Sequence, residues 1–350
     1  MKLYRDEPGW AERLVAHAAP SVTLRSAFPQ QLPRLAFLRE LAKIRLRALL
    51  HPRQTPAWLR LLNSHPAFSE YLRTCPRFLY KVYRPYISTT LDAAQRLAAI
   101  RAHYEFIFRR GLGQVVARAS MGPVTLAEAH GRSSLPYRIE LRTVDRFDRE
   151  GELVLQLVQG DENEVLYTVA FTLAPRDGVH ALSIGCIQGG KSADAREAIR
   201  VATRELHGLR PKQLMVNLVR QLAHDYGCER VVMVSNRNRV IYKAIRNGRV
   251  LADYDGLWAE LGARKRADGD YELACAALAP PDLEAIPSKK RAEARRRHEV
   301  LMLLADGVGR GLRARGAYTL PAQPRPCHSR ESGNPECITG VELSASTQTR

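Results

Sequence analysis

The sequence predicts a mixed α/β fold of the α+β kind, with a helical N-terminal region followed by an antiparallel meander sheet that is flanked by helices. Over residues 31–112, apolar side chains recur at intervals of three and four residues, as on one face of a helix. Near residue 136 the period changes to two, which is typical of half-buried strands. Four such stretches follow one another with only turn residues between them, so neighbouring strands must pair antiparallel.

The helical region begins with an amphipathic, basic helix. Its apolar face carries Phe37, Leu41, Ile44 and Ala48. The opposite, basic face carries Arg39, Lys43 and Arg47. A second helix is expected from Leu91, because apolar residues recur at helical spacing from Leu97 to Ile107. The segment between them, PRFLYKVYRPY at 76–86, is rich in aromatic residues and proline.

The meander is expected to use four strands, at 137–141, 153–158, 165–173 and 181–187. Turn residues separate them at 148–151, 160–163 and 175–178. Helices should follow at 194–206, where Asp194 and Glu197 suggest a capping box, and at 211–227, where Pro211 suits a first helical position. A buried strand at 230–235 and shorter helices at 238–246, 254–261 and 289–304 complete the pattern.

These elements suggest four segments. Residues 1–120 form a helical basic N-terminal region, 121–280 a central α/β domain, and 281–320 a basic helical segment. Residues 321–350 mix proline, serine, threonine and glycine without periodicity and predict a disordered tail. Part of that tail, HSRESGNPE at 328–336, looks like a translated bacterial repetitive element.

Composition narrows the classes of function. The chain has 350 residues, 54 of them Lys or Arg and 36 Asp or Glu, and its net charge of +18 favours polyanionic partners. The six cysteines lie far apart, so neither structural zinc nor a disulfide framework is expected, and no metal site is predicted. No apolar run approaches the ~20 residues that cross a bilayer, and the start MKLYRDEPGW is too charged for a signal peptide, so we expect a cytoplasmic protein.

The basic C-terminal segment suggests a surface role. Residues 286–315 hold nine basic and three acidic residues, a net charge of +6, together with an apolar helical stripe. Such a helix could sit against an anionic membrane surface, so the protein could be peripheral to the inner membrane. A solvated helix face explains the same pattern. No DNA- or RNA-binding motif accompanies the charge, so specific DNA binding is not expected, and the oligomeric state is not predicted.

One segment matches a nucleotide-binding pattern. Residues 185–192 read GCIQGGKS, which satisfies GxxxxGK[ST] and would place Lys191 on phosphates and Ser192 on magnesium. The strands before it form a meander rather than a parallel sheet, and no clean Walker B strand is present. A flexible strand-to-helix connection is the favoured interpretation of the segment, and nucleotide binding stays an alternative.

A second segment predicts an anion site. HGLRPK at 207–212 leads into a leucine-striped helix, so Arg210 and Lys212 flank a helix N-terminus with free amides. In the alternative interpretation, Gly208 simply ends the preceding helix and the cations are solvated.

Six short motifs carry a family resemblance. They are YRPY at 83–86, HYEFI at 103–107, IGCIQG at 184–189, HGLRPKQLM at 207–215, VSN at 234–236 and YDGLWAELG at 254–262. Over residues 30–300 the chain resembles the VirK/YbjX family, which has no established biochemical activity. The resemblance implies a link to envelope stress, virulence or tolerance of cationic antimicrobial peptides.

The order of the central elements also resembles that of GNAT acyltransferases, whose acyl-CoA lies in an opening between splayed strands. By this resemblance the donor's phosphates would lie at Gly208, Arg210 and Lys212, next to Gln188 and Gly189. Tyr242 would protonate the leaving group, beside Asn236.

YDGLWAELG adds a second candidate site. Glu260 is a candidate base beside Trp258, although core packing explains this helix as well. Together, the candidate donor-binding and catalytic residues predict transfer of an acyl or aminoacyl group, from acyl-CoA or aminoacyl-tRNA, to an envelope-related acceptor. A non-enzymatic peripheral membrane or regulatory protein is the competing hypothesis.

Overall fold

The computed structural model describes residues 21–25, 33–143, 147–160, 164–190, 193–241 and 252–316. They all belong to one compact unit, Met1–Tyr318. In this part of the chain, no helix is both long enough and apolar enough to span a membrane.

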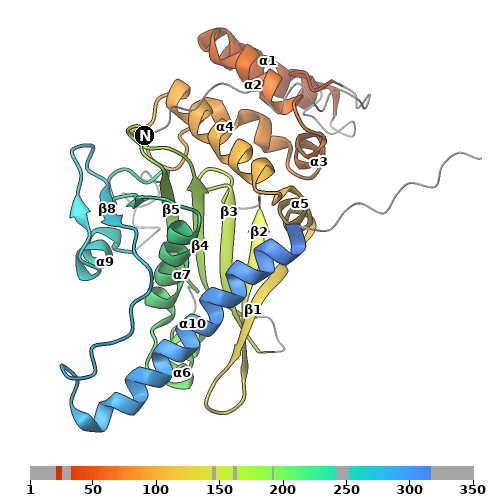
Figure 1. Ribbon diagram of the computed structural model, residues 1–350. Coiled ribbons are helices and arrows are strands. Elements are labelled where there is room, and N and C mark those ends of the chain that lie inside the picture. The colour runs from red at the N-terminus through yellow and green to blue at the C-terminus, as the bar shows by residue number, and fades with distance from the viewer. Residues whose placement is uncertain are drawn as a thin grey trace, which may run out of the picture. The chain divides into compact units, whose positions relative to one another are not determined.

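The N-terminal region is helical, as predicted (Figure 1). Its elements are α1 (Arg34–Leu50), α2 (Gln54–Leu62), α3 (Pro66–Thr74), the 3-10 helix η2 (Pro76–Tyr83), α4 (Ala93–Arg109) and α5 (Gly113–Met121). The predicted second helix is α4, which begins with a capping box in which Asp92 accepts from the Gln95 N–H and Gln95 accepts from the Asp92 N–H.

The sheet has eight strands in the order β1-β2-β3-β4-β5-β6-β8-β7. Their bounds are β1 Val124–His130, β2 Pro136–Thr143, β3 Leu153–Gln159, β4 Glu164–Leu173, β5 Ala181–Gly189, β6 Arg230–Met233, β7 Arg264–Lys265 and β8 Tyr271–Ala274. The first five strands form an antiparallel meander, of which β2 to β5 are the four predicted strands, and β5 and β6 pair in parallel. Strands β1, β7 and β8 were not predicted from the sequence.

The parallel pair β5 and β6 separates after a short contact. Four residue pairs join the strands, ending at Ile184 and Met233, and the Val234 N–H still donates to the Ile184 carbonyl over 3.1 Å. From there β5 continues to Gly189, whereas β6 has ended. Among the described strands, the end of β5 therefore has β4 as its one neighbour.

In the described part of the chain, four helices accompany this half of the sheet, namely α6 (Ala193–Glu205), α7 (Pro211–Asp225), α9 (Tyr254–Glu260) and α10 (Ser288–Gly316). Figure 1 shows α7 and the long α10 lying across the sheet, with α10 running along β1. Three expectations need correction. Asp194 lies inside the first turn of α6 and Glu197 pairs with Arg200, so they form no capping box. Of the helix predicted at 238–246, residues 238–241 are turn and bridge, and residues 242–246 lie outside the described residues. Helix α10 extends beyond the predicted 289–304.

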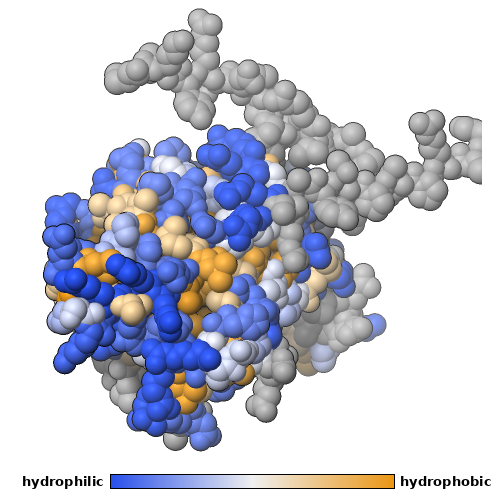
Figure 2. Space-filling view, turned by 60° about the horizontal axis from the view of Figure 1, so that its bottom comes forward, coloured by the Kyte–Doolittle hydropathy of each residue, from blue (hydrophilic) through white to orange (hydrophobic). Residues whose placement is uncertain are grey.

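One hydrophobic core joins the N-terminal helices to the sheet and to α7 and α10. At the end of the molecule that Figure 2 turns forward, a band of hydrophobic residues crosses a mostly hydrophilic surface. The predicted segment boundaries at residues 120 and 280 stay a prediction, as does the tail at 321–350, which lies outside the described residues.

A buried ion pair lies where the helices meet the sheet. The Lys81 ammonium is 2.7 Å from Glu152 Oε1, and both side chains are fully buried. The hydroxyls of Tyr86 and Tyr104 donate to the two oxygens of this carboxylate over 2.6 and 2.7 Å. Burial by itself would raise the pKa of Glu152, but Lys81 and its other partners lower it below the ordinary value.

Candidate functional site

A cavity of about 500 Å³ opens where β5 loses its β6 neighbour. Its walls come from the ends of β4 and β5, from α6, from the start of α7, from residue 239 and from the start of α9. The lining residues are Tyr167, Ile187, Gln188, Gly189, Gly190, Arg196, Ile199, Lys212, Arg239, Ala252, Asp253, Tyr254 and Leu257. A volume of this size is within the range of small-ligand sites.

The Tyr254 hydroxyl occupies the first open position on the edge of β5. It donates to the Ile187 carbonyl over 2.6 Å and accepts from the Ile187 N–H over 2.8 Å. Burial raises the pKa of Tyr254 well above its ordinary value, so the phenol keeps its proton. Backbone groups alternate sides along a strand, so the next open position beside the cavity is at Gly189.

Among the described residues, three cations line the cavity. They are Arg196 from α6, Lys212 from α7 and Arg239 from the segment after β6, against one carboxylate, that of Asp253. Arg239 is 1% exposed and its guanidinium lies 3.8 Å above the centre of the Tyr254 ring. Arg239 Nε is buried without a hydrogen-bond partner among the described residues. The cavity can therefore hold an anionic group next to its apolar walls.

Glu260 bridges the two cations of the predicted anion site. Its carboxylate accepts from Arg210 over 3.1 Å and from Lys212 over 3.3 Å, and all three side chains are partly or largely exposed. Lys212 also lines the cavity, whereas Arg210 and Glu260 are not among its lining residues. The arrangement is an ion-paired rim that a stronger anion can open.

Asn236 positions α9. Its side-chain amide donates to Asp253 and accepts from the Tyr254 N–H, each over 2.8 Å. Its backbone N–H donates to Asp255. Hydrogen bonds from the Gly256 N–H and from Asn236 lower the pKa of Asp253, which caps α9. All the polar side-chain atoms of Asn236 thus serve to hold the helix that carries Tyr254.

Gly208 faces α10 rather than the first cavity. It lies in the turn after α6 with a φ of +79°, and a Cβ there would lie 3.1 Å from the Arg297 guanidinium of α10. Gly208 is therefore absent from the lining of the first cavity. Of the five predicted donor-binding residues, the structure brings Gln188, Gly189 and Lys212 to one cavity and leaves Arg210 at its rim.

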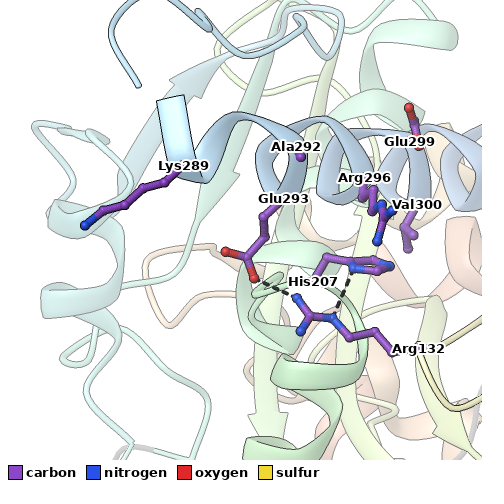
Figure 3. A pocket seen from close by; sticks show the side chains of 8 residues that line it. All are labelled: Arg132, His207, Lys289, Ala292, Glu293, Arg296, Glu299 and Val300. Atoms are coloured by element: carbon purple, nitrogen blue, oxygen red, sulfur yellow. Dashed lines mark hydrogen bonds and ion pairs between the residues drawn. The ribbon is translucent and has the colours of Figure 1, made fainter. Parts of the chain in front are cut away.

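The residue before Gly208 faces a second cavity, of about 760 Å³, between α10 and residues 132 and 207. Figure 3 shows Arg132 reaching both His207 Nδ1, over 3.2 Å, and Glu293, over 2.7 Å. Burial, and then the neighbouring Arg132 and Arg296, lower the pKa of His207. Acidic and basic groups alternate along this groove, so its charge is largely compensated.

Several predicted residues have other positions. Tyr242, Lys191 and Ser192 lie outside the described residues. Trp258 is fully buried and its indole donates to the Val234 carbonyl, so it packs in the core rather than lining the cavity. Burial raises the pKa of the Cys186 thiol, which leaves it a poor nucleophile. In the described part of the chain no group of acidic, histidine and cysteine side chains is placed to hold a metal ion.

Four lining residues of the first cavity were not among the predicted site residues, namely Arg196, Arg239, Tyr167 and Asp253. Arg239 stands in the polar run SNRNR, where nothing in the local pattern marks one arginine as buried. Asp253 precedes a helix and could have been recognised as its cap.

The six motifs gather in two places. YRPY and HYEFI supply Tyr86 and Tyr104 to the buried Glu152. The other four motifs build the first cavity. IGCIQG supplies part of its wall, and HGLRPKQLM supplies the cation Lys212. VSN supplies Asn236, which supports α9, and YDGLWAELG supplies α9 itself.

Fold and cavity together define a mixed α/β protein with an antiparallel meander and a cationic cavity where a parallel strand pair parts. The chain belongs to the family described as "Protein of unknown function (DUF535)", whose model matches residues 35–308. It is 31% identical over 264 residues to the "Uncharacterized protein YbjX" of Escherichia coli (strain K12), covering 74% of this chain and 79% of that relative. These matches confirm the resemblance to the VirK/YbjX family.

Two more distant likenesses were found. A relative named "Membrane protein LapB" from Mannheimia haemolytica is 23% identical, over 61% of this chain and 90% of its own length. A solved cAMP-binding acyltransferase from Mycobacterium smegmatis is 12% identical and covers 61% of each chain. Its TM-score of 0.28 is too low to indicate a common fold.

Proposed function

We propose that the first cavity binds an acyl donor, either an acyl-CoA or an aminoacyl-tRNA, and that the protein transfers the acyl or aminoacyl group to an acceptor. The observation that carries this proposal is the separation of β5 from β6 directly beside a cavity with cationic and apolar walls. Both donors combine phosphates with a reactive acyl carbonyl, and that combination matches the two kinds of wall.

The walls suggest how a donor would lie. Lys212 and Arg196 stand at the α7 and α6 side and would hold phosphates, since both carry flexible cationic side chains. Ile187, Ile199 and Leu257 provide apolar surface for the acyl arm. Because Tyr254 fills the β5 edge at Ile187, a donor that pairs with this strand would do so at Gly189.

In the proposed reaction the acceptor's nucleophilic atom forms a bond to the acyl carbonyl carbon. The bond from that carbon to the sulfur of CoA, or to the ribose oxygen of tRNA, then breaks. We assign proton donation to the leaving atom to Tyr242. We assign proton removal to Glu260 for an acceptor that enters at the rim, once the donor's phosphates have taken Lys212 from its carboxylate. Asn236 is a positioning residue, because its side chain holds α9.

The test is a binding titration of the full chain with acetyl-CoA, a long-chain acyl-CoA and an aminoacyl-tRNA, with free CoA and deacylated tRNA alongside. The variant Lys212→Ala/Arg196→Ala should weaken donor binding about 10- to 100-fold, since each removes a charged contact. Arg204→Ala is the matched control, because Arg204 is also on α6 but pairs with Glu197 and does not line the cavity. Tyr242→Phe should abolish transfer while binding persists.

If none of the donors binds, or if the double variant binds as tightly as the control, the proposal is wrong. Donor binding without transfer to any amine or hydroxyl acceptor would leave a donor-binding protein and would overturn the enzymatic part.

A further inference from the structure

The outer face of α1 exposes leucines to solvent. Among the described residues, eight large hydrophobic side chains are exposed, and five of them belong to α1, namely Leu35, Leu38, Leu46, Leu49 and Leu50. Leu35 is 82% exposed and Leu49 76%. At 100° per residue, the first four of these leucines fall on one narrow stripe that runs the length of the helix. Single exposed leucines are ordinary, but a continuous stripe of them marks an interaction surface.

The opposite face of α1 is already occupied. Leu41 and Ile44 are buried in the core, 6% and 0% exposed. The leucine stripe is therefore not needed to attach the helix to the protein. Figure 1 places α1 at the outer edge of the described part, at the end away from α6 and from the start of α10.

Positive charges border the stripe on both sides. By helical geometry, Arg34 and Arg45 lie along one side and Arg39 and Lys43 along the other, and all four are exposed. Glu40, the helix's acidic residue, accepts from Lys43 and from the Tyr80 hydroxyl and lies 3.7 Å from Arg39, so it compensates one of the two positive charges on that side. The stripe thus has a cationic border on each side.

This charge pattern favours an anionic bilayer surface over a second copy of the chain as the partner of the stripe. A second copy of the chain packed stripe to stripe would bring the cationic borders of two helices together, which costs free energy. A bilayer surface with anionic headgroups accepts both features, because its acyl boundary takes apolar side chains and its phosphates take cations. A 17-residue helix is about 25 Å long and can lie along such a surface.

We propose that α1 docks the protein on an anionic phospholipid surface, with its leucine stripe at the acyl boundary and its bordering cations on the headgroups. This surface is far in sequence from the donor cavity, and the docking does not depend on the proposed reaction.

The experiment measures co-flotation of the full chain with vesicles of phosphatidylcholine containing 30% phosphatidylglycerol, compared with phosphatidylcholine alone. Leu46→Gln/Leu49→Gln should weaken binding to the anionic vesicles about tenfold or more, since two apolar side chains leave the acyl boundary. Leu303→Gln/Met121→Gln is the matched control, because these side chains are 49% and 68% exposed but lie on α10 and α5. The control should bind as the wild-type chain does.

Further measurements decide between the outcomes. Loss of binding in Arg34→Gln/Arg45→Gln, or at high salt, supports the cationic border. Equal binding by the leucine variant and its control, or no flotation of the wild-type chain, overturns the proposal. If the wild-type chain is a dimer by light scattering and Leu46→Gln/Leu49→Gln is a monomer, the stripe joins two copies instead, and lipid docking is wrong.

Discussion

Glu152 shows how single residues decide this fold. A carboxylate with no solvent exposure is costly to bury, and the structure offsets that cost with one ammonium and two phenol hydroxyls. Those partners come from η2, from the turn after it and from α4, so the network ties the N-terminal helices to the sheet. Removing one member leaves the remaining charge buried and uncompensated.

We therefore expect Lys81→Met to lower the free energy of unfolding by about 3–5 kcal/mol, and Glu152→Gln by a similar amount. The double variant Lys81→Met/Glu152→Gln should cost at least ~2 kcal/mol less than the sum, because it buries no lone charge. Urea denaturation of the four proteins measures this coupling. The exposed pair of Lys43 and Glu40 is the control, and Lys43→Met/Glu40→Gln should change stability by less than ~1 kcal/mol. Additive costs at the buried pair would contradict the prediction.

At the scale of elements, the helices and strands whose apolar residues recur at a regular interval were predicted. The four meander strands, α4, α6, α7 and α9 were expected close to their observed bounds. The sequence analysis did not predict β1, β7 and β8, because β7 and β8 have two and four residues and β1 packs under α10. For α1, the packing face was predicted correctly. The exposed leucines among the basic residues were not recognised as a stripe, because apolar residues on two sides of one helix weaken its amphipathic pattern.

The contact between α10 and β1 depends on two small residues. A Cβ at Gly307 would lie 2.6 Å from Ala127 Cβ, and one at Gly311 would lie 2.7 Å from the Leu126 carbonyl oxygen. Gly309 faces elsewhere, and a Cβ there would lie 3.3 Å from the flexible Arg313 guanidinium. The same substitution should therefore have opposite effects at neighbouring positions.

We expect Gly311→Ala to lower the free energy of unfolding by about 1–3 kcal/mol, because the helix must move off the strand. Gly309→Ala should raise it by up to ~1 kcal/mol through helix propensity alone. Thermal and urea denaturation compare the two variants with the wild-type chain. Equal effects at both positions would show that α10 does not pack closely on β1 in solution.

At the scale of the whole molecule, the candidate site joins segments that are far apart in the sequence. HGLRPK was predicted as an anion site because a helix start with two cations is visible locally. The structure divides that segment between two cavities, with His207 facing one and Lys212 the other. Arg239 and Tyr167 reach the first cavity only through sheet topology, which no local pattern encodes. The sequence therefore indicates the chemistry of the site, and the fold decides which residues share it.

The junction of helices and sheet also makes overall stability depend on pH. His103 of α4 is fully buried, its Nδ1 accepts from the Leu173 N–H of β4, and its Nε2 has no hydrogen-bond partner among the described residues. Burial lowers the pKa of His103 to about 4, with Glu152 opposing and Lys81 reinforcing the shift. The unfolded chain takes up a proton near the ordinary value of 6.5, and the folded chain does not. Stability is then complete above that pH and falls as the pH decreases towards 4.

For the wild-type chain, the share of this loss due to His103 should reach about 2 kcal/mol at pH 5 relative to pH 7.5. His103→Gln keeps an acceptor for the Leu173 N–H but does not titrate, so its free energy of unfolding should decrease less between these two pH values. His224→Gln is the control, because His224 is exposed, and it should show the wild-type dependence. Urea denaturation at both pH values measures the difference. If His103→Gln loses as much stability as the wild-type chain, acid destabilisation arises elsewhere, and the junction does not set the response to pH.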